Sequence, residues 1–252
     1  MKLRIGMAAL MILLSVSVAR AGWVIHQETP GGPGTMYVQN NQMRAGMGLG
    51  GMIYNLNNET VTMLNPDHQV YWSGNPQQLN QQMTQALDAR MEQALKQAPP
   101  EQRDQMRAMM KQRMGRGMAP PAADVKVKDT GETSKIAGYE SNKYQVYVDG
   151  KLRQEMWVAQ LPGFKREMDM GKMMKLAHAL RTGTGGQGLG WRRAQAVQEL
   201  MSRGMPMKIV DYNRGGPMTV MTVTKVEKKS LPASTFQPPT GWKKVDFRQM
   251  MR

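Results

Sequence analysis

The sequence predicts an α+β fold in which one curved, open antiparallel sheet is partly covered by α-helices. Three observations support this prediction. Short segments that alternate apolar and polar residues occupy both ends of the chain, as expected of strands with one buried face. Between them lie segments with an apolar residue at every third or fourth position, the period of an amphipathic helix. Glycine, proline and asparagine separate the strand segments, which indicates tight turns between neighbouring strands.

The first strand region extends from Trp23 to Trp72 and predicts a meander of short antiparallel strands. Its alternating runs are WVIHQET, TMYVQN, MIYNLN, TVTMLN and QVYW. Asn57-Asn58 lies between two of these runs and is typical of a hairpin turn, because asparagine tolerates a positive φ angle.

A long amphipathic helix is predicted after the first strands. Its apolar residues recur every four positions and are Leu79, Met83, Leu87, Met91 and Leu95. We expect this helix to cover the apolar face of the sheet. Pro99-Pro100 ends the helix and can start a second, methionine-rich helical segment that runs to about Met118.

Strands resume at Val125, and Asp149-Gly150 is a strong hairpin signal within them. Helices are expected over 164–181 and 191–203, on either side of a glycine-rich loop. Three final runs complete the sheet, the last of them a tail through Trp242. We therefore expect one domain over 22–252, with helical insertions near 77–118 and 163–203.

The first 21 residues have the form of a Sec-type signal peptide. Lys2 and Arg4 precede an apolar run over 7–18, and Ala19-Arg20-Ala21 matches a signal-peptidase site. The apolar run is too short to span a bilayer, which needs about 20 residues. We expect cleavage after Ala21, a periplasmic or otherwise exported location, and no membrane span in the mature protein.

Composition argues against most recognisable chemistries. The chain has no cysteine and only three histidines, which excludes disulfides, a thiol nucleophile and cysteine-ligated metal sites. It contains neither a G-x-S-x-G nor an H-E-x-x-H motif. The segment 183–188 matches G-x-G-x-x-G, but a predicted helix precedes it instead of a strand, so we interpret it as a connector. We expect no enzymatic activity, no catalytic residue and no cofactor.

Methionine is the compositional anomaly, with 27 residues of this type. Unbranched thioethers fill irregular apolar gaps, so core or cavity lining is the favoured interpretation. Two alternatives stay open. Met205 and Met207 are spaced closely enough to bind Cu(I), which prefers soft thioether ligands, and methionines can also buffer oxidants by forming sulfoxides.

The formal net charge of +15 indicates anionic partners. In an exported protein these are anionic envelope components in place of nucleic acid. A further alternative is a basic adaptor or structural protein of the cell envelope that acts through the segment 103–116.

Three segments resemble a known family of exported bacterial proteins. They are MIYNLNNETVTMLNPDHQVYW, KIAGYESNKYQVYVDGKLRQEMWVA and VTKVEKKSLPASTFQPPTGWKK. The family is a domain of unknown function of the 4412 type, and it is similar to the periplasmic lipoprotein-carrier and outer-membrane lipoprotein-receptor superfamily. The resemblance implies an open, lipoprotein-carrier-like β half-barrel with helices across its mouth. The better-known relatives hold lipid acyl chains between sheet and helices.

The expected function is therefore non-enzymatic binding of an apolar or amphipathic ligand, such as a lipid or a lipoprotein acyl chain. We expect the ligand between the sheet and its covering helices. The residues expected to line this cavity are Ile25, Met52, Tyr54, Met63, Trp72, Met83, Leu87, Met91, Tyr144, Val146 and Met156.

Overall fold

The computed structural model describes residues 21–47, 50–97, 99, 103, 124–181, 194–212 and 216–250. Its strands are β1 (Gly22–Thr29), β2 (Gly32–Gln39), β3 (Gln42–Met47), β4 (Gly50–Asn55), β5 (Thr60–Asn65), β6 (Val70–Gly74), β7 (Val125–Ile136), β8 (Tyr139–Val148), β9 (Lys151–Ala159), β10 (Met205–Asp211), β11 (Met218–Lys229) and β12 (Lys243–Lys244). Its helices are α1 (Pro76–Gln97), α3 (Phe164–Glu167), α4 (Met170–Arg181), α5 (Gln195–Arg203), α6 (Phe247–Met250) and the 3₁₀ turn η3 (Ala233–Phe236). The expected leader apart from Ala21, the glycine-rich loop, and the segment 103–116 apart from Arg103 lie outside the described residues.

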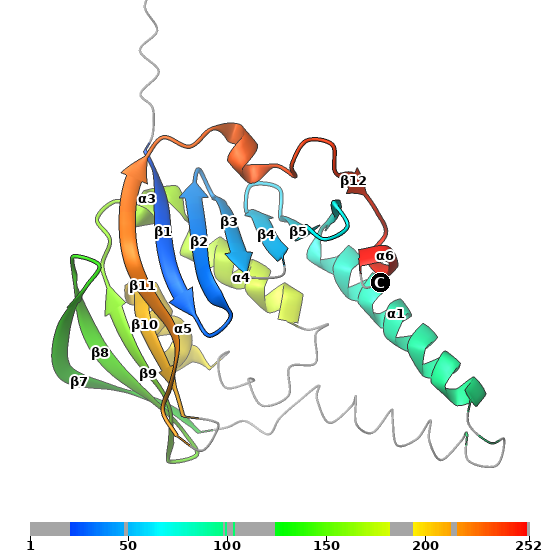
Figure 1. Cartoon of the computed structure of the whole chain (residues 1–252). Helices are drawn as coiled ribbons and strands as arrows, with labels where there is room; N and C mark the ends of the chain where they lie inside the picture. The colour runs from blue at the N-terminus through cyan, green and yellow to red at the C-terminus, as the bar shows by residue number, and fades with distance from the viewer. Residues whose placement is uncertain are drawn as a thin grey trace, which may run out of the picture.

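All of these strands belong to one open sheet with the order β12-β6-β5-β4-β3-β2-β1-β11-β10-β9-β8-β7 (Figure 1). Every neighbouring pair is antiparallel except β12 and β6, which are parallel. The sheet thus consists of two meanders, β1–β6 and β7–β11, which meet where β1 pairs with β11. The predicted mostly antiparallel, helix-covered α+β fold is confirmed at this level.

The two predicted hairpin turns are both present. Asp149 and Gly150 have φ angles of 51° and 73°, as a two-residue turn with both central residues in the left-handed region requires. At Asn57-Asn58 the positive φ of 54° falls on Glu59. Asn58 stabilises the turn differently, because its side-chain oxygen accepts a hydrogen bond from the Thr60 backbone N–H at 3.2 Å. The turn was predicted correctly, but the reason given for it was wrong.

Helices α3 and α4 pack on one face of the sheet. Phe164, Met168 and Leu176 from this helical pair belong to a buried cluster with residues of the first meander, here called the α3–α4 cluster. Trp23 of β1 meets Phe164 edge to face, with ring centroids 5.8 Å apart. The predicted helix over 164–181 is therefore two helices, since Met168 is extended and Asp169 caps α4 by accepting the Lys172 N–H at 3.0 Å.

Helix α5 packs beside the second meander. Val197 and Leu200 form a second cluster with apolar residues of β8 and β9. The helices thus pack on different parts of the sheet: α3 and α4 pack on the first meander, and α5 packs on the second (Figure 1).

Helix α1 forms as predicted but does not cover the sheet. Leu79 in its first turns packs against Trp72 and Phe247, and Asn80 donates a hydrogen bond to the Ala179 carbonyl of α4 at 2.8 Å. Beyond this contact the helix extends away from the strands (Figure 1). The expected covering role was wrong, because an apolar stripe shows that a helix face is buried without showing which surface buries it. No helix in the described part of the chain has the length and hydropathy to cross a membrane.

The opposite face of the sheet is crossed by the segment that follows β11. Leu231 and Phe236 of this segment pack against Val24, Ile53 and Leu64, which alternate along their strands with residues of the helix-covered face. The segment then reaches the far edge of the sheet, where the Val245 N–H donates to the Tyr71 carbonyl at 2.9 Å. Both faces of the first meander are therefore covered in part, one by helices and one by this segment.

Candidate functional site

The residues expected to line one cavity are distributed over separate packed clusters. Ile25, Met52 and Tyr54 belong to the α3–α4 cluster. Met63, Trp72 and Met83 surround Phe247. Tyr144, Val146 and Met156 pack against α5.

Two of the expected lining residues lie on the projecting part of α1. Met91 is half-buried there, and the Leu87 side chain is outside the described set. None of the expected residues lines either of the two hollows described below.

A pocket of about 360 Å³, here called the helix-side pocket, lies between the β9–α3 turn and the α5–β10 corner. Its volume is at the lower end of the range of small-molecule sites, about 300–1,000 Å³. Its apolar wall consists of Leu161, Phe164, Met170, Met201 and Met205. Three methionines on one wall make it adaptable to irregular apolar ligands.

The charged residues of the helix-side pocket are all cationic. They are Lys165, Arg166 and Arg203, and no carboxylate is among the residues that line it. Within the described ranges neither Lys165 nor Arg166 forms an ion pair, while the Arg203 guanidinium lies 5.4 Å from the Tyr144 ring centroid. Beside the pocket, Lys228 donates a hydrogen bond to the Pro162 carbonyl at 2.9 Å. The site therefore combines apolar walls with a positive rim.

Two glycines allow the walls of this pocket to approach each other. Gly163 has a φ of 89°, in the left-handed region that favours glycine, and starts α3. Gly204 ends α5 against β9, where a Cβ atom would collide with the Ala159 carbonyl. Nothing in their sequence surroundings distinguished these glycines from those of ordinary loops.

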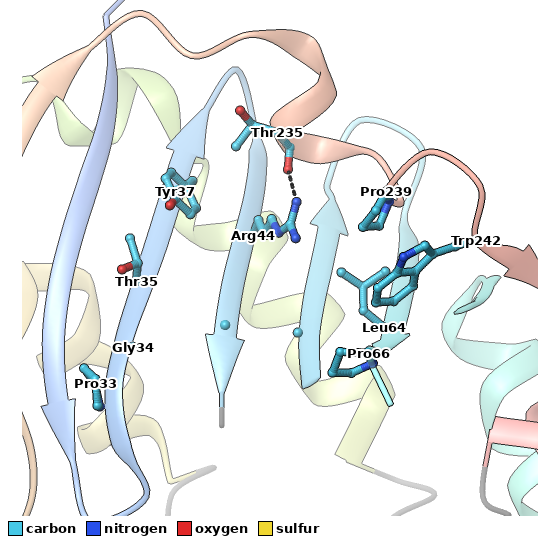
Figure 2. Close-up of a pocket in the computed structure, with 12 residues that line it drawn as sticks. Pro33, Gly34, Thr35, Tyr37, Arg44, Leu64, Pro66, Thr235, Pro239 and Trp242 are labelled. Carbon is cyan, nitrogen blue, oxygen red and sulfur yellow. Dashed lines mark hydrogen bonds between the residues drawn. The ribbon is translucent and has the colours of Figure 1, made fainter. Parts of the chain in front are cut away.

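A second hollow of about 670 Å³, the glycine-floored groove, lies on the opposite face under the C-terminal segment (Figure 2). Gly46 and Gly51 are cross-strand partners on β3 and β4, and a Cβ on Gly34 of β2 would lie 3.0 Å from the Gly46 carbonyl. Gly46 and Gly51 leave a floor of bare backbone, and Gly34 lies at its edge. Thr35 and Tyr37 form one wall, and Leu64, Pro239 and Trp242 form the other.

Arg44 lies between these two walls (Figure 2). Its Nη1 donates a hydrogen bond to the Thr235 carbonyl at 3.2 Å, which joins β3 to the C-terminal segment. It is the one charged residue in the lining, and it forms no ion pair with any described residue.

A hydrogen-bonded chain connects the groove to β11. Thr35 Oγ1 lies 3.3 Å from His26 Nδ1, and His26 Nε2 lies 3.1 Å from Glu227 Oε2. The order hydroxyl, imidazole, carboxylate is that of a catalytic triad. However, the His26 and Glu227 side chains are 38% and 33% exposed, and Lys225 also binds Glu227 at 2.9 Å. Hydrogen bonds from Lys225 and His26 hold the pKa of Glu227 below its usual range. Because these side chains are exposed, the hydrogen-bonded residues form a solvated network that joins three strands.

A more buried polar network lies across β8, β9 and β10. Glu155 accepts hydrogen bonds from Gln145 at 2.9 Å and from the Tyr212 hydroxyl at 3.0 Å, and Lys143 Nζ lies 3.1 Å from its carboxylate. Burial alone would raise the pKa of Glu155, but these three donors outweigh it and hold the pKa below its usual value. Lys143 and Lys208 also lie 5.3 and 4.9 Å from the Trp157 ring centroid. All of these polar groups have partners, so the network holds strands together instead of leaving groups for a ligand.

The predicted Met205–Met207 pair is divided between two environments. Met207 is fully buried in the α3–α4 cluster, whereas Met205 packs against that cluster and also lines the helix-side pocket. Among the described residues no three His, Cys, Asp or Glu side chains gather where they could hold a metal ion.

Comparisons with known proteins give a family match and several remote structural likenesses. The family model described as Domain of unknown function (DUF4412) matches residues 59–242. No curated protein matches the sequence significantly. A structure of PNGF-II is similar at 14% identity and a TM-score of 0.39, covering 92% of this chain and 32% of that one. The crystal structure of MucB is similar at 12% identity and a TM-score of 0.29, covering 88% of this chain and 58% of that one. The chain thus spans less than two thirds of the length of either protein.

Proposed function

The chain belongs to the DUF4412 family of unknown function, and we propose that it is an exported, non-enzymatic protein that binds an anionic amphipathic ligand in the helix-side pocket. The ligand is a fatty acid, or the acyl chain of a lipid or lipoprotein with an anionic group nearby. The proposal includes the lipoprotein-carrier-like half-barrel that the sequence resemblance implies. The single observation that carries it is a pocket with methionine-rich walls and an exclusively cationic set of charged residues.

The apolar wall supports the acyl part of the ligand. Met170, Met201 and Met205 come from three different elements, so their flexible side chains can follow a curved chain. Each buried CH₂ group contributes about 0.8 kcal/mol, so about ten such groups contribute about 8 kcal/mol before the entropic cost of binding is subtracted.

The charged rim supports the anionic end. Lys165 and Arg166 are adjacent on α3 and have no carboxylate partner among the described residues. An arginine fork binds a carboxylate or phosphate through two parallel hydrogen bonds, which are about twice as strong as neutral ones. A neutral amphiphile cannot form ion pairs with these two cations, so the pocket should bind ligands with an anionic head group more tightly than neutral ones.

Binding of oleate and of oleyl alcohol to the purified protein tests the proposal. We expect oleate to bind more tightly, and Arg166→Gln to weaken oleate binding about tenfold while affecting oleyl alcohol little. Lys172→Gln, an exposed cation on α4 outside the pocket, is the matched control. Met201→Trp should reduce binding of both ligands by filling the pocket. Equal affinity for the two ligands, or wild-type oleate binding by both pocket variants, would refute the proposal.

The same three thioethers give Cu(I) binding its specific support as a second candidate. The three cations around the pocket argue against it, because they repel a metal cation. Titration with Cu(I) against a competing chelator distinguishes the two functions. Tight binding that is lost in Met205→Leu, with Met207→Leu as the buried comparison, would favour the metal.

A further inference from the structure

We propose that the glycine-floored groove is a second, separate binding site and that it takes an acidic saccharide, with the sugar carboxylate on Arg44. This site lies on the sheet face opposite the helix-side pocket, so it does not depend on the proposed function. Three features of the groove support this assignment: its floor, its unpartnered donors and the residues of its walls.

The floor explains why a flat ligand can approach the sheet closely. Gly46 and Gly51 face each other on β3 and β4, and Gly34 of β2 lies at the edge of this strip. β2 and β5, which carry the two walls, are three strand spacings or about 14 Å apart. A bare strip of that width accommodates a sugar ring and its substituents between walls made of side chains.

The groove also contains polar donors that the protein leaves unused. Arg44 gives one hydrogen bond to the Thr235 carbonyl, and its guanidinium has five N–H groups. Neither the Tyr37 hydroxyl nor the Trp242 indole N–H has a hydrogen-bond partner among the described residues. A ligand with a carboxylate and several hydroxyls supplies the acceptors that these donors lack.

The walls favour a saccharide over an acyl chain. Hydroxyl-bearing Thr35 and Tyr37 line one side, while Pro239 and the half-buried Trp242 ring line the other. Aromatic and proline surfaces pack well on the apolar C–H face of a sugar ring, while its hydroxyls reach the polar wall. The groove is partly open to solvent, and an acyl chain gains less there because part of it would stay exposed to water.

Isothermal titration with tri-galacturonic acid, against a neutral galactose trisaccharide, tests this assignment. We expect saturable binding of the acidic trisaccharide and at least tenfold weaker binding of the neutral one. Arg44→Gln should weaken binding of the acidic trisaccharide about tenfold to a hundredfold, and Arg44→Lys less, since lysine keeps the charge but not the fork. Tyr37→Phe, which removes only a hydroxyl, should cause a few-fold loss.

Three controls keep the outcome unambiguous. Arg248→Gln removes an exposed arginine on α6 outside the groove and should change nothing. Arg166→Gln in the helix-side pocket should leave saccharide binding intact, which separates this proposal from the proposed function. Circular dichroism verifies that each variant folds. The assignment is overturned if acidic and neutral sugars bind equally, if Arg44→Gln binds like the wild type, or if acetate binds as tightly as the trisaccharide.

Discussion

Comparing the ion pairs that Glu155 and Glu132 form with Lys143 measures how burial changes the contribution of an ion pair to stability. Both carboxylates lie 3.1 Å from the same Lys143 ammonium, but the Glu155 side chain is 11% exposed and that of Glu132 is 64% exposed. Replacing each by glutamine removes one charge at nearly constant shape. The two variants therefore share a partner and a distance and differ in the surroundings of the carboxylate.

The expected cost is much larger at the buried position. In Glu155→Gln the amide group cannot accept from Lys143, Gln145 and Tyr212 together, so at least one donor loses its acceptor. An unsatisfied buried donor costs about 1–3 kcal/mol, so we expect a loss of about 2 kcal/mol, or about 4–8 °C in Tm for a chain of this size. Glu132→Gln should cost less than about 1 kcal/mol, because water screens the exposed pair.

Thermal unfolding at neutral and acidic pH measures both effects. The pKa of Glu155 is held below its usual value of 4.5, so its ionised form stabilises the fold above that pH. This contribution is lost as the pH falls through the lowered pKa, and the difference between wild type and Glu155→Gln should shrink accordingly. Equal losses in the two variants, or a difference that persists in acid, would refute this reasoning.

Two further predictions concern packing. Gly204→Ala should destabilise the protein by about 1–3 kcal/mol, because the new methyl group collides with the Ala159 carbonyl; urea unfolding should show no comparable loss for Gly216→Ala, where the space is open. Phe247→Ala should cost about 3–5 kcal/mol, since it removes a 4% exposed ring that packs edge to face on Trp72. A loss of less than about 1 kcal/mol for Phe247→Ala would mean that α6 contributes little to the fold.

Local patterns predicted the elements well, because their causes are local. The alternation in TVTMLN and the left-handed turn at Asp149-Gly150 depend on neighbours within a few residues. The four-residue period from Leu79 to Leu95 likewise predicted α1. The surface on which α1 packs could not be predicted, since Trp72 and Phe247 are far apart in the sequence.

The candidate sites were less predictable, because each is formed by segments that are far apart in the sequence. The helix-side pocket combines a turn near residue 163 with a corner near residue 204, and no single segment shows both. In the groove, Gly46 and Gly51 become neighbours only through strand register. One usable signal was present for the Glu155 network, because Lys143, Gln145 and Glu155 occupy alternate positions on two strands joined by a predicted hairpin.

The pairing of β1 with β11 has a consequence for the order of folding. His26 lies opposite Lys225, so the central seam joins residues almost at opposite ends of the chain. The chain emerges N-terminus first where it folds, so the outer edge of β1 is exposed before its partner β11 arrives. During this time the second meander is completed strand by strand, and the nascent chain carries an open edge in the middle of its future sheet. We expect this seam to close after each meander has formed, because its partners are farther apart in the sequence than those of any other pair of described strands. Until then the chain can misassociate at an edge that the finished sheet protects.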